Sequence, residues 1–116
     1  MGRDLDGFCR RLVKKGMAGK ASPGRIALEF VDYFALSTYP HLMELHQVLR
    51  EAGVGELRAE RLPSGLRGLH FSYGPDGGDP TILYEQEQWT GAQEHSILHE
   101  AYEIIQERLA LLVPGY

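Results

Sequence analysis

Histidine and glutamate side chains recur along residues 91–107, in the stretch GAQEHSILHEAYEIIQE. In a helix, successive residues are rotated by about 100°, so with His95 at zero His99 falls at about 40°. Glu103 then falls at about 80° and Glu100 at about 140°, while apolar residues fill the rest of the wheel. The stretch therefore predicts a helix with one core face and one face that carries these four side chains.

The spacing on this face is that of a metal site. Imidazoles or carboxylates at positions i and i+4 of a helix lie one above the other and can occupy two corners of a zinc tetrahedron. His99 and Glu103 have this spacing. Glu100 has the position from which a carboxylate acts as general base in the H-E-x-x-H signature of zinc hydrolases. Here Glu103 stands in place of the second histidine of that signature.

The substitution leaves three interpretations open. Glutamate is an accepted zinc ligand, although its charge lowers the Lewis acidity of the ion and makes the site more suitable for manganese or iron(II). His95 can add a third ligand from the same helix, beside His99 and Glu103. The same residue types also occur on any solvated helix face, in which case no metal is bound.

The preceding elements must position this helix. Ser22 is a candidate N-cap for a helix that ends at the segment STYP, and Pro40 opens a second helix that stops at Gly53. The segments GELRAERL and LRGLHFSYG alternate in hydrophobicity and predict two strands, and TILYEQE predicts a third because it begins with the strand-forming residues Thr, Ile, Leu and Tyr. Thr90 then caps the last helix, with Gln93 completing a capping box. The order predicts an α+β fold, with helices packed on a small three-stranded antiparallel sheet.

The charge is unevenly distributed. Residues 1–25 contain seven Lys and Arg residues and two Asp residues, although the chain has a net charge of -4. We expect residues 1–22 to form a basic N-terminal helix and linker, and residues 23–116 to form the domain. The basic segment either contacts nucleic acid or another anionic surface, or lies on its own acidic domain. The acidic remainder repels phosphate and is a poor partner for nucleic acid.

The composition is that of a soluble protein. Apolar residues make up 43% and charged residues 24% of the chain. No apolar run reaches the roughly 18 residues of a membrane span, and the N-terminus lacks the apolar centre of a signal peptide. A single cysteine, Cys9, excludes an intrachain disulfide and fits a reducing compartment. We therefore expect a cytoplasmic protein with no membrane partner.

The segment EHSILHEAYEII resembles the core of the ImmA/IrrE family of small zinc-peptidase-like domains. Ser96 stands where the family has a threonine, His99 and Glu100 match its first ligand and general base, and Ile104 and Ile105 match an apolar pair. Two upstream helices, a Gly-Val step into a small sheet and a strand before the active helix also match. The resemblance covers roughly residues 23–107 and implies a zincin-like fold.

The sequence departs from the family pattern in three places. Glu103 replaces the second histidine, and Tyr102 stands where a small residue is usual, which would crowd a metal. The later helix that carries the third glutamate ligand in the family has no counterpart here. Either the chain is cut short before that helix or the site is incomplete. Glu107 is the nearby carboxylate that would substitute for this ligand.

The resemblance implies a zinc-dependent metallopeptidase whose substrate is a peptide or protein, such as a transcriptional repressor, in a stress response. The alternative is a catalytically inactive sensor or protein-interaction domain of the same fold. A homodimer that pairs two such helices in one site is a third possibility. Strands beside the active helix line the cleft in zincin-like folds, which makes His70, on the second predicted strand, the most interesting of the other histidines.

Overall fold

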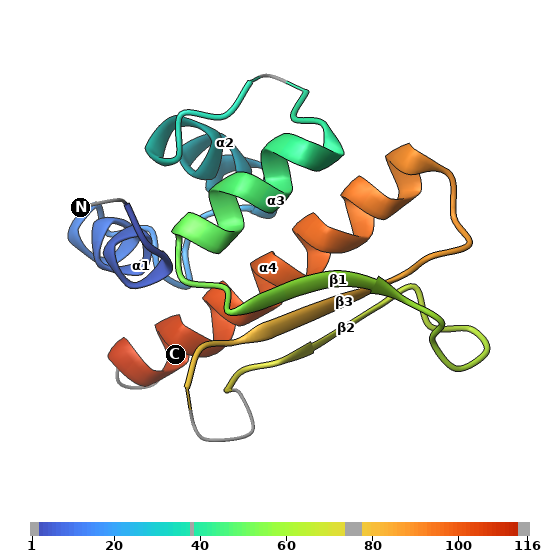
Figure 1. Cartoon of the computed structure of the whole chain (residues 1–116). Helices are drawn as coiled ribbons and strands as arrows, with labels where there is room; N and C mark the ends of the chain where they lie inside the picture. The colour runs from blue at the N-terminus through green and yellow to red at the C-terminus, as the bar shows by residue number, and fades with distance from the viewer. Residues whose placement is uncertain (1–2, 38, 74–77, 114–116) are drawn as a thin grey trace.

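The computed structural model describes residues 3–37, 39–73 and 78–113 (Figure 1). The elements in chain order are α1 (Leu5–Lys14), α2 (Pro23–Tyr33), α3 (Leu42–Glu51), β1 (Glu56–Glu60), β2 (Gly68–Phe71), β3 (Thr81–Glu85) and α4 (Thr90–Leu112). In Figure 1, α4 runs along one face of the sheet, and the other three helices lie on that same side. The α+β prediction is confirmed.

The sheet is mixed, so the prediction of an antiparallel sheet is wrong in part. Its strand order is β1-β3-β2, with β1 parallel and β2 antiparallel to β3. The central strand is the most apolar one: Thr81, Ile82 and Tyr84 of β3 are buried. A buried, apolar strand is favoured in the centre of a sheet, between two neighbouring strands. By contrast, the charged sequence Glu-Leu-Arg-Ala-Glu of β1 is typical of a strand at the edge of a sheet. Because alternation within a strand carries no information on its neighbours, the sequence did not reveal this order.

Capping side chains set the beginnings of α2 and α3, and a glycine follows the end of α3. Ser22 caps α2, as predicted, by accepting a hydrogen bond from the backbone N–H of Arg25 at 3.3 Å. The third helix begins at Leu42, two residues after the predicted Pro40, because the Nδ1 atom of His41 caps it. Gly53, just after this helix, has a φ of 110°, a conformation that glycine adopts without strain.

The first helix contributes to the common hydrophobic core. Phe8 is fully buried, and its ring centroid lies 5.4 Å from that of Phe30 and 5.8 Å from that of Phe34, both on the second helix and its end. Cys9 is also buried, and burial raises the pKa of its thiol to about 11. A thiol in this setting is a core side chain rather than a nucleophile or metal ligand.

Two basic side chains at the end of α1 form ion pairs with α2. Arg11 contacts Glu29 at 3.1 Å and Asp32 at 2.6 Å, and Lys15 contacts Glu29 at 2.8 Å. Of the two interpretations of the basic N-terminal segment, these ion pairs favour the one in which it lies on its own acidic domain.

We expect the stability gained from Glu29 to depend on pH. The hydrogen bond from Lys15, with further help from Arg11, lowers the pKa of the Glu29 carboxyl. A carboxyl whose folded pKa is below its unfolded value stabilises the fold above the unfolded pKa, and this contribution is lost as the pH falls through the folded pKa. Glu29→Gln should therefore be less stable than wild type at pH 7, by roughly 1 kcal/mol, and nearly equal at pH 3. Urea unfolding at both pH values, with Glu51→Gln as an exposed control, checks this; an equal difference at both values would contradict it.

Within the described residues, none of the helices combines the length and apolar character required to cross a membrane.

Candidate metal centre

The long helix α4 begins without the predicted capping box. Its first helical residue is Thr90, and the N-cap is Trp89, which makes no side-chain capping hydrogen bond. Gln93 instead donates from its amide to the carbonyl of Gln86 at 3.2 Å. The prediction of Thr90 as the cap is therefore wrong by one residue, because the turn after β3 carries the chain into the helix without a side-chain cap.

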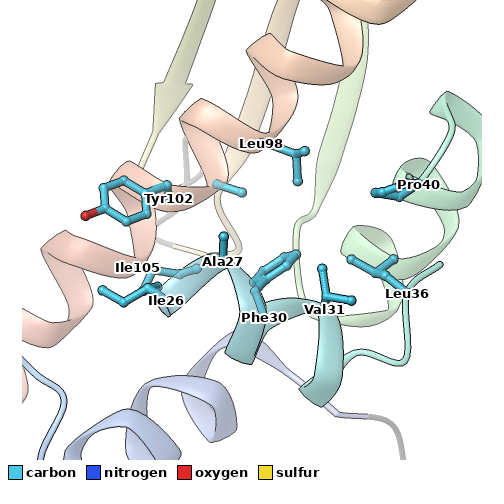
Figure 2. Close-up of a pocket in the computed structure, with 10 residues that line it drawn as sticks. Ile26, Ala27, Phe30, Val31, Leu36, Pro40, Leu98, Tyr102 and Ile105 are labelled. Atoms are coloured by element: carbon cyan, nitrogen blue, oxygen red, sulfur yellow. The ribbon is translucent and has the colours of Figure 1, made fainter. Parts of the chain in front are cut away.

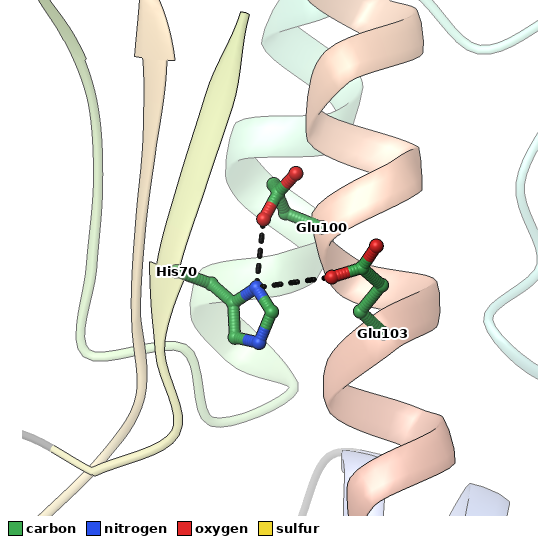
Figure 3. A group of neighbouring side chains, drawn as sticks. All are labelled: His70, Glu100 and Glu103. Atoms are coloured by element: carbon green, nitrogen blue, oxygen red, sulfur yellow. Dashed lines mark hydrogen bonds and ion pairs between the residues drawn. The ribbon is translucent and has the colours of Figure 1, made fainter. Parts of the chain in front are cut away.

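Where α4 meets β2, a histidine of the strand lies among three glutamates of the helix, two of which, Glu100 and Glu103, are shown with His70 in Figure 3. The imidazole of His70, on β2, points at the helix with only 11% of its side chain exposed. Its Nδ1 atom lies 2.7 Å from Oε1 of Glu100 and 3.8 Å from Oε2 of Glu103. Its Nε2 atom lies 2.7 Å from Oε1 of Glu107. One imidazole from the sheet thus contacts three carboxylates on successive turns of the helix.

Glu100 is buried between the helix and the strand, with 7% of its surface exposed. It reaches β2 beside Gly68, where a Cβ atom would lie 3.0 Å from Cγ and Oε2 of Glu100. Gly68 and His70 are two residues apart and so project to the same face of the strand. The missing side chain at Gly68 therefore provides the space in which the carboxylate approaches His70.

The electrostatics of the cluster favour a charged imidazole when no metal is bound. Burial opposes protonation of His70, but its hydrogen bonds with Glu100 and Glu107 outweigh burial and raise the pKa of the ring. The hydroxyl of Ser72 donates to Oε2 of Glu107. This bond, together with that from His70, lowers the pKa of Glu107.

The donor atoms of His70, Glu100 and Glu103 lie close enough together that they could hold a metal ion. One ligand atom of each lies within 4.8 Å of the others. Donors about 2.1 Å from a tetrahedral ion are about 3.4 Å apart. The observed 2.7 Å and 3.8 Å separations from Nδ1 fall on either side of this value. To hold an ion, the Glu100 oxygen would move about 0.7 Å further from Nδ1 and the Glu103 oxygen about 0.4 Å closer to it. The residue types fit zinc, manganese or iron(II).

Two of the predicted site residues belong to this group, and two do not. Glu100 and Glu103 are in it, so Glu100, predicted as a general base, is here one of the three residues that could hold an ion. His99 lies at the rim, with 56% of its side chain exposed and its Nε2 atom 2.8 Å from Oε1 of Glu103. His95 is exposed and lies outside the group. The third member of the group is His70, which the sequence singled out only as a strand residue beside the helix.

A separate apolar pocket of about 210 Å³ lies on the opposite side of α4, against α2 (Figure 2). Its lining residues are apolar side chains from α2, the following loop and α4: Ile26, Ala27, Phe30, Val31, Leu36, Pro40, Leu98, Ala101, Tyr102 and Ile105. Tyr102 therefore points away from the His70 group. Tyr102 would not crowd an ion held by the His70 group, because this residue lines the pocket on the other face of the helix.

Comparison with known proteins found no matching family model, no matching curated protein and no matching solved structure. The resemblance to the ImmA/IrrE family thus stays a prediction from the motif on α4 and the order of elements.

Proposed function

We propose that this chain binds one divalent transition-metal ion between β2 and α4, as the centre of a metallopeptidase-type domain of the ImmA/IrrE kind. The observation that carries the proposal is the convergence of His70, Glu100 and Glu103, whose candidate ligand atoms lie within 4.8 Å of one another. These residues come from a strand and a helix that are separated in sequence, so the cluster is not a product of helix periodicity alone.

The ligand set favours a hard or borderline ion. One imidazole and two carboxylates suit manganese(II), iron(II) and zinc, and the two negative charges disfavour the softer ions that prefer thiolates. Zinc is the ion that the family resemblance implies. The proposal assigns Glu100 as a ligand, and not as the general base that its position in the motif indicated.

When bound, the ion would supply Lewis-acid activation of water and of a substrate carbonyl. The side chains on its open side then determine access and proton transfer. Glu103 and His99 are each about half exposed, with 45% and 56% of their side chains accessible, so the site opens to solvent on this side. We assign proton transfer to the imidazole of His99, which is oriented by its contact with Glu103.

The substrate class in this proposal is a peptide or an exposed segment of a protein, such as a transcriptional repressor. It rests on the resemblance of α4 to the family's active helix. The single, deeply buried thiol of Cys9 is compatible with a reducing compartment such as the cytoplasm. A homodimer is not required for this site, since one chain provides all three ligands.

Hydrolysis of a set of fluorogenic peptides, with and without added Mn²⁺ or Zn²⁺, tests the enzymatic proposal. We expect metal-dependent cleavage by wild type. His99→Ala should retain the ion but lose about 100-fold or more in rate, the usual effect of removing a general base. His95→Ala, an exposed histidine one turn away, is the matched control and should cleave as wild type does. Equal rates for His99→Ala and wild type would contradict the role of His99.

A second candidate function is a metal-responsive sensor or interaction domain without catalysis. It is favoured by the two carboxylate ligands, because a more negative shell makes the ion a weaker Lewis acid. Stoichiometric metal binding without cleavage of any peptide would select this candidate. In that case, the search for function moves to proteins that bind the metal-loaded form.

A further inference from the structure

We infer that Glu107, held by Ser72, is a positioning residue that fixes the ring of His70 so that its Nδ1 atom faces the metal ion. This inference rests on the proposed function, because it concerns the same site. It assigns a role to a carboxylate that lies outside the three-ligand group.

The two nitrogens of His70 face different sets of carboxylates. Nδ1 faces Glu100 and Glu103, the two other members of the ligand group, whereas Nε2 is 2.7 Å from Oε1 of Glu107. Glu103 and Glu107 are one helical turn apart on the same face of α4. The helix thus offers a ligand to one side of the ring and a hydrogen-bond acceptor to the other.

A neutral imidazole carries a proton on one nitrogen and a lone pair on the other, and only the lone pair can bind a metal. A carboxylate that accepts a hydrogen bond from Nε2–H holds the proton there and leaves the lone pair on Nδ1. Histidine ligands commonly have such a carboxylate partner, which fixes the ring orientation and increases the basicity of the ligand. Glu107 has the geometry for this role.

Ser72 holds Glu107 in place. It follows the last residue of β2 and is two residues beyond His70, so it emerges on the side of the strand that faces α4. Its hydroxyl donates to Oε2 of Glu107, while Oε1 faces His70. Both oxygens of the carboxylate are therefore occupied, and the group cannot rotate freely away from the ring, although about half of its side chain is exposed.

Zinc affinity measured by competition with a chromophoric chelator, on the full chain, tests this role. We expect Glu107→Ala to bind zinc 10- to 100-fold more weakly than wild type. Glu107→Gln should recover most of the loss, because its amide oxygen can still accept from Nε2–H. Ser72→Ala should bind several-fold more weakly, and Glu94→Ala, a carboxylate removed elsewhere on α4, should bind as wild type does.

The ring nitrogens report the positioning directly. In zinc-loaded wild type, long-range ¹H–¹⁵N spectra should show His70 bound through Nδ1 with the proton on Nε2. If Glu107 had a purely structural role, Glu107→Ala would change the melting temperature, but zinc would still bind His70 through Nδ1 with the proton on Nε2. Wild-type affinity in both Glu107→Ala and Ser72→Ala, or coordination of zinc through Nε2, would overturn the inference while leaving the proposed metal site intact. Absence of zinc binding by wild type would overturn the proposed site itself.

Discussion

His70→Ala should reduce the affinity of the chain for Mn²⁺ or Zn²⁺ by at least about 100-fold, whereas His99→Ala should leave it within a few-fold of wild type. The reason is the position of each ring. His70 is the sole imidazole among the three described residues whose ligand atoms converge, while His99 is at the solvent-exposed rim and contacts only Glu103. Losing one of three protein ligands removes a large share of the binding free energy, and second-shell changes alone cost 10- to 100-fold.

Isothermal titration of each purified variant with Mn²⁺ and Zn²⁺ measures the difference, with His95→Ala as the control. The reverse order of effects would contradict the account. If His99→Ala lost the ion and His70→Ala kept it, the ligands would be His99 and Glu103. Glu100 would then act as the general base, as the motif alone indicates.

Phe8→Ala should lower the free energy of unfolding by about 3–5 kcal/mol, a large part of the stability of a domain of this size. Phe8 is completely buried and packs edge-on against Phe30, with their ring planes at 90°. Its ring also lies 5.6 Å from that of Tyr33. Removal of this ring leaves a cavity where α1 meets α2, and an N-terminal helix that was only a leader would show no such effect.

Thermal and urea unfolding followed by circular dichroism measure this loss. A change of 3–5 kcal/mol corresponds to a decrease in melting temperature of at least about 10 °C. Leu28→Ala is the matched control, since Leu28 is an apolar residue of α2 that is 72% exposed, and its removal should change stability by less than about 0.5 kcal/mol. Equal stability of the two variants would show that residues 1–22 fold and unfold independently of the core.

The sequence was most informative where local chemistry determines structure. The helical period of residues 91–107 placed Glu100 and Glu103 on the side away from the apolar stripe, and these two side chains do meet β2. The cap at Ser22 was predicted because its hydroxyl acts on a backbone N–H three residues away. These features depend on neighbours within one or two turns, and such neighbours can be read from spacing.

The features that the sequence could not provide depend on contacts between distant segments. His70 and Glu100 are 30 residues apart, and they meet because β3 lies between the two edge strands and α4 then crosses the sheet toward β2. The spacing of residues along the sequence does not indicate that β3 pairs between β1 and β2. Alternation along the strand does show that Gly68 and His70 share a face. Which face of the sheet α4 covers depends on the path of the chain after β3, and alternation carries no information on it.

The metal content of the wild-type chain tests the central claim most directly. It should be measured by inductively coupled plasma mass spectrometry on protein purified without a chelator or a histidine tag, before and after dialysis against Mn²⁺ or Zn²⁺. The account predicts about one divalent ion per chain, which His70→Ala loses. No bound ion in the wild-type protein after either metal is offered would contradict it, and the cluster of His70, Glu100 and Glu103 would then be an ion-paired contact between β2 and α4.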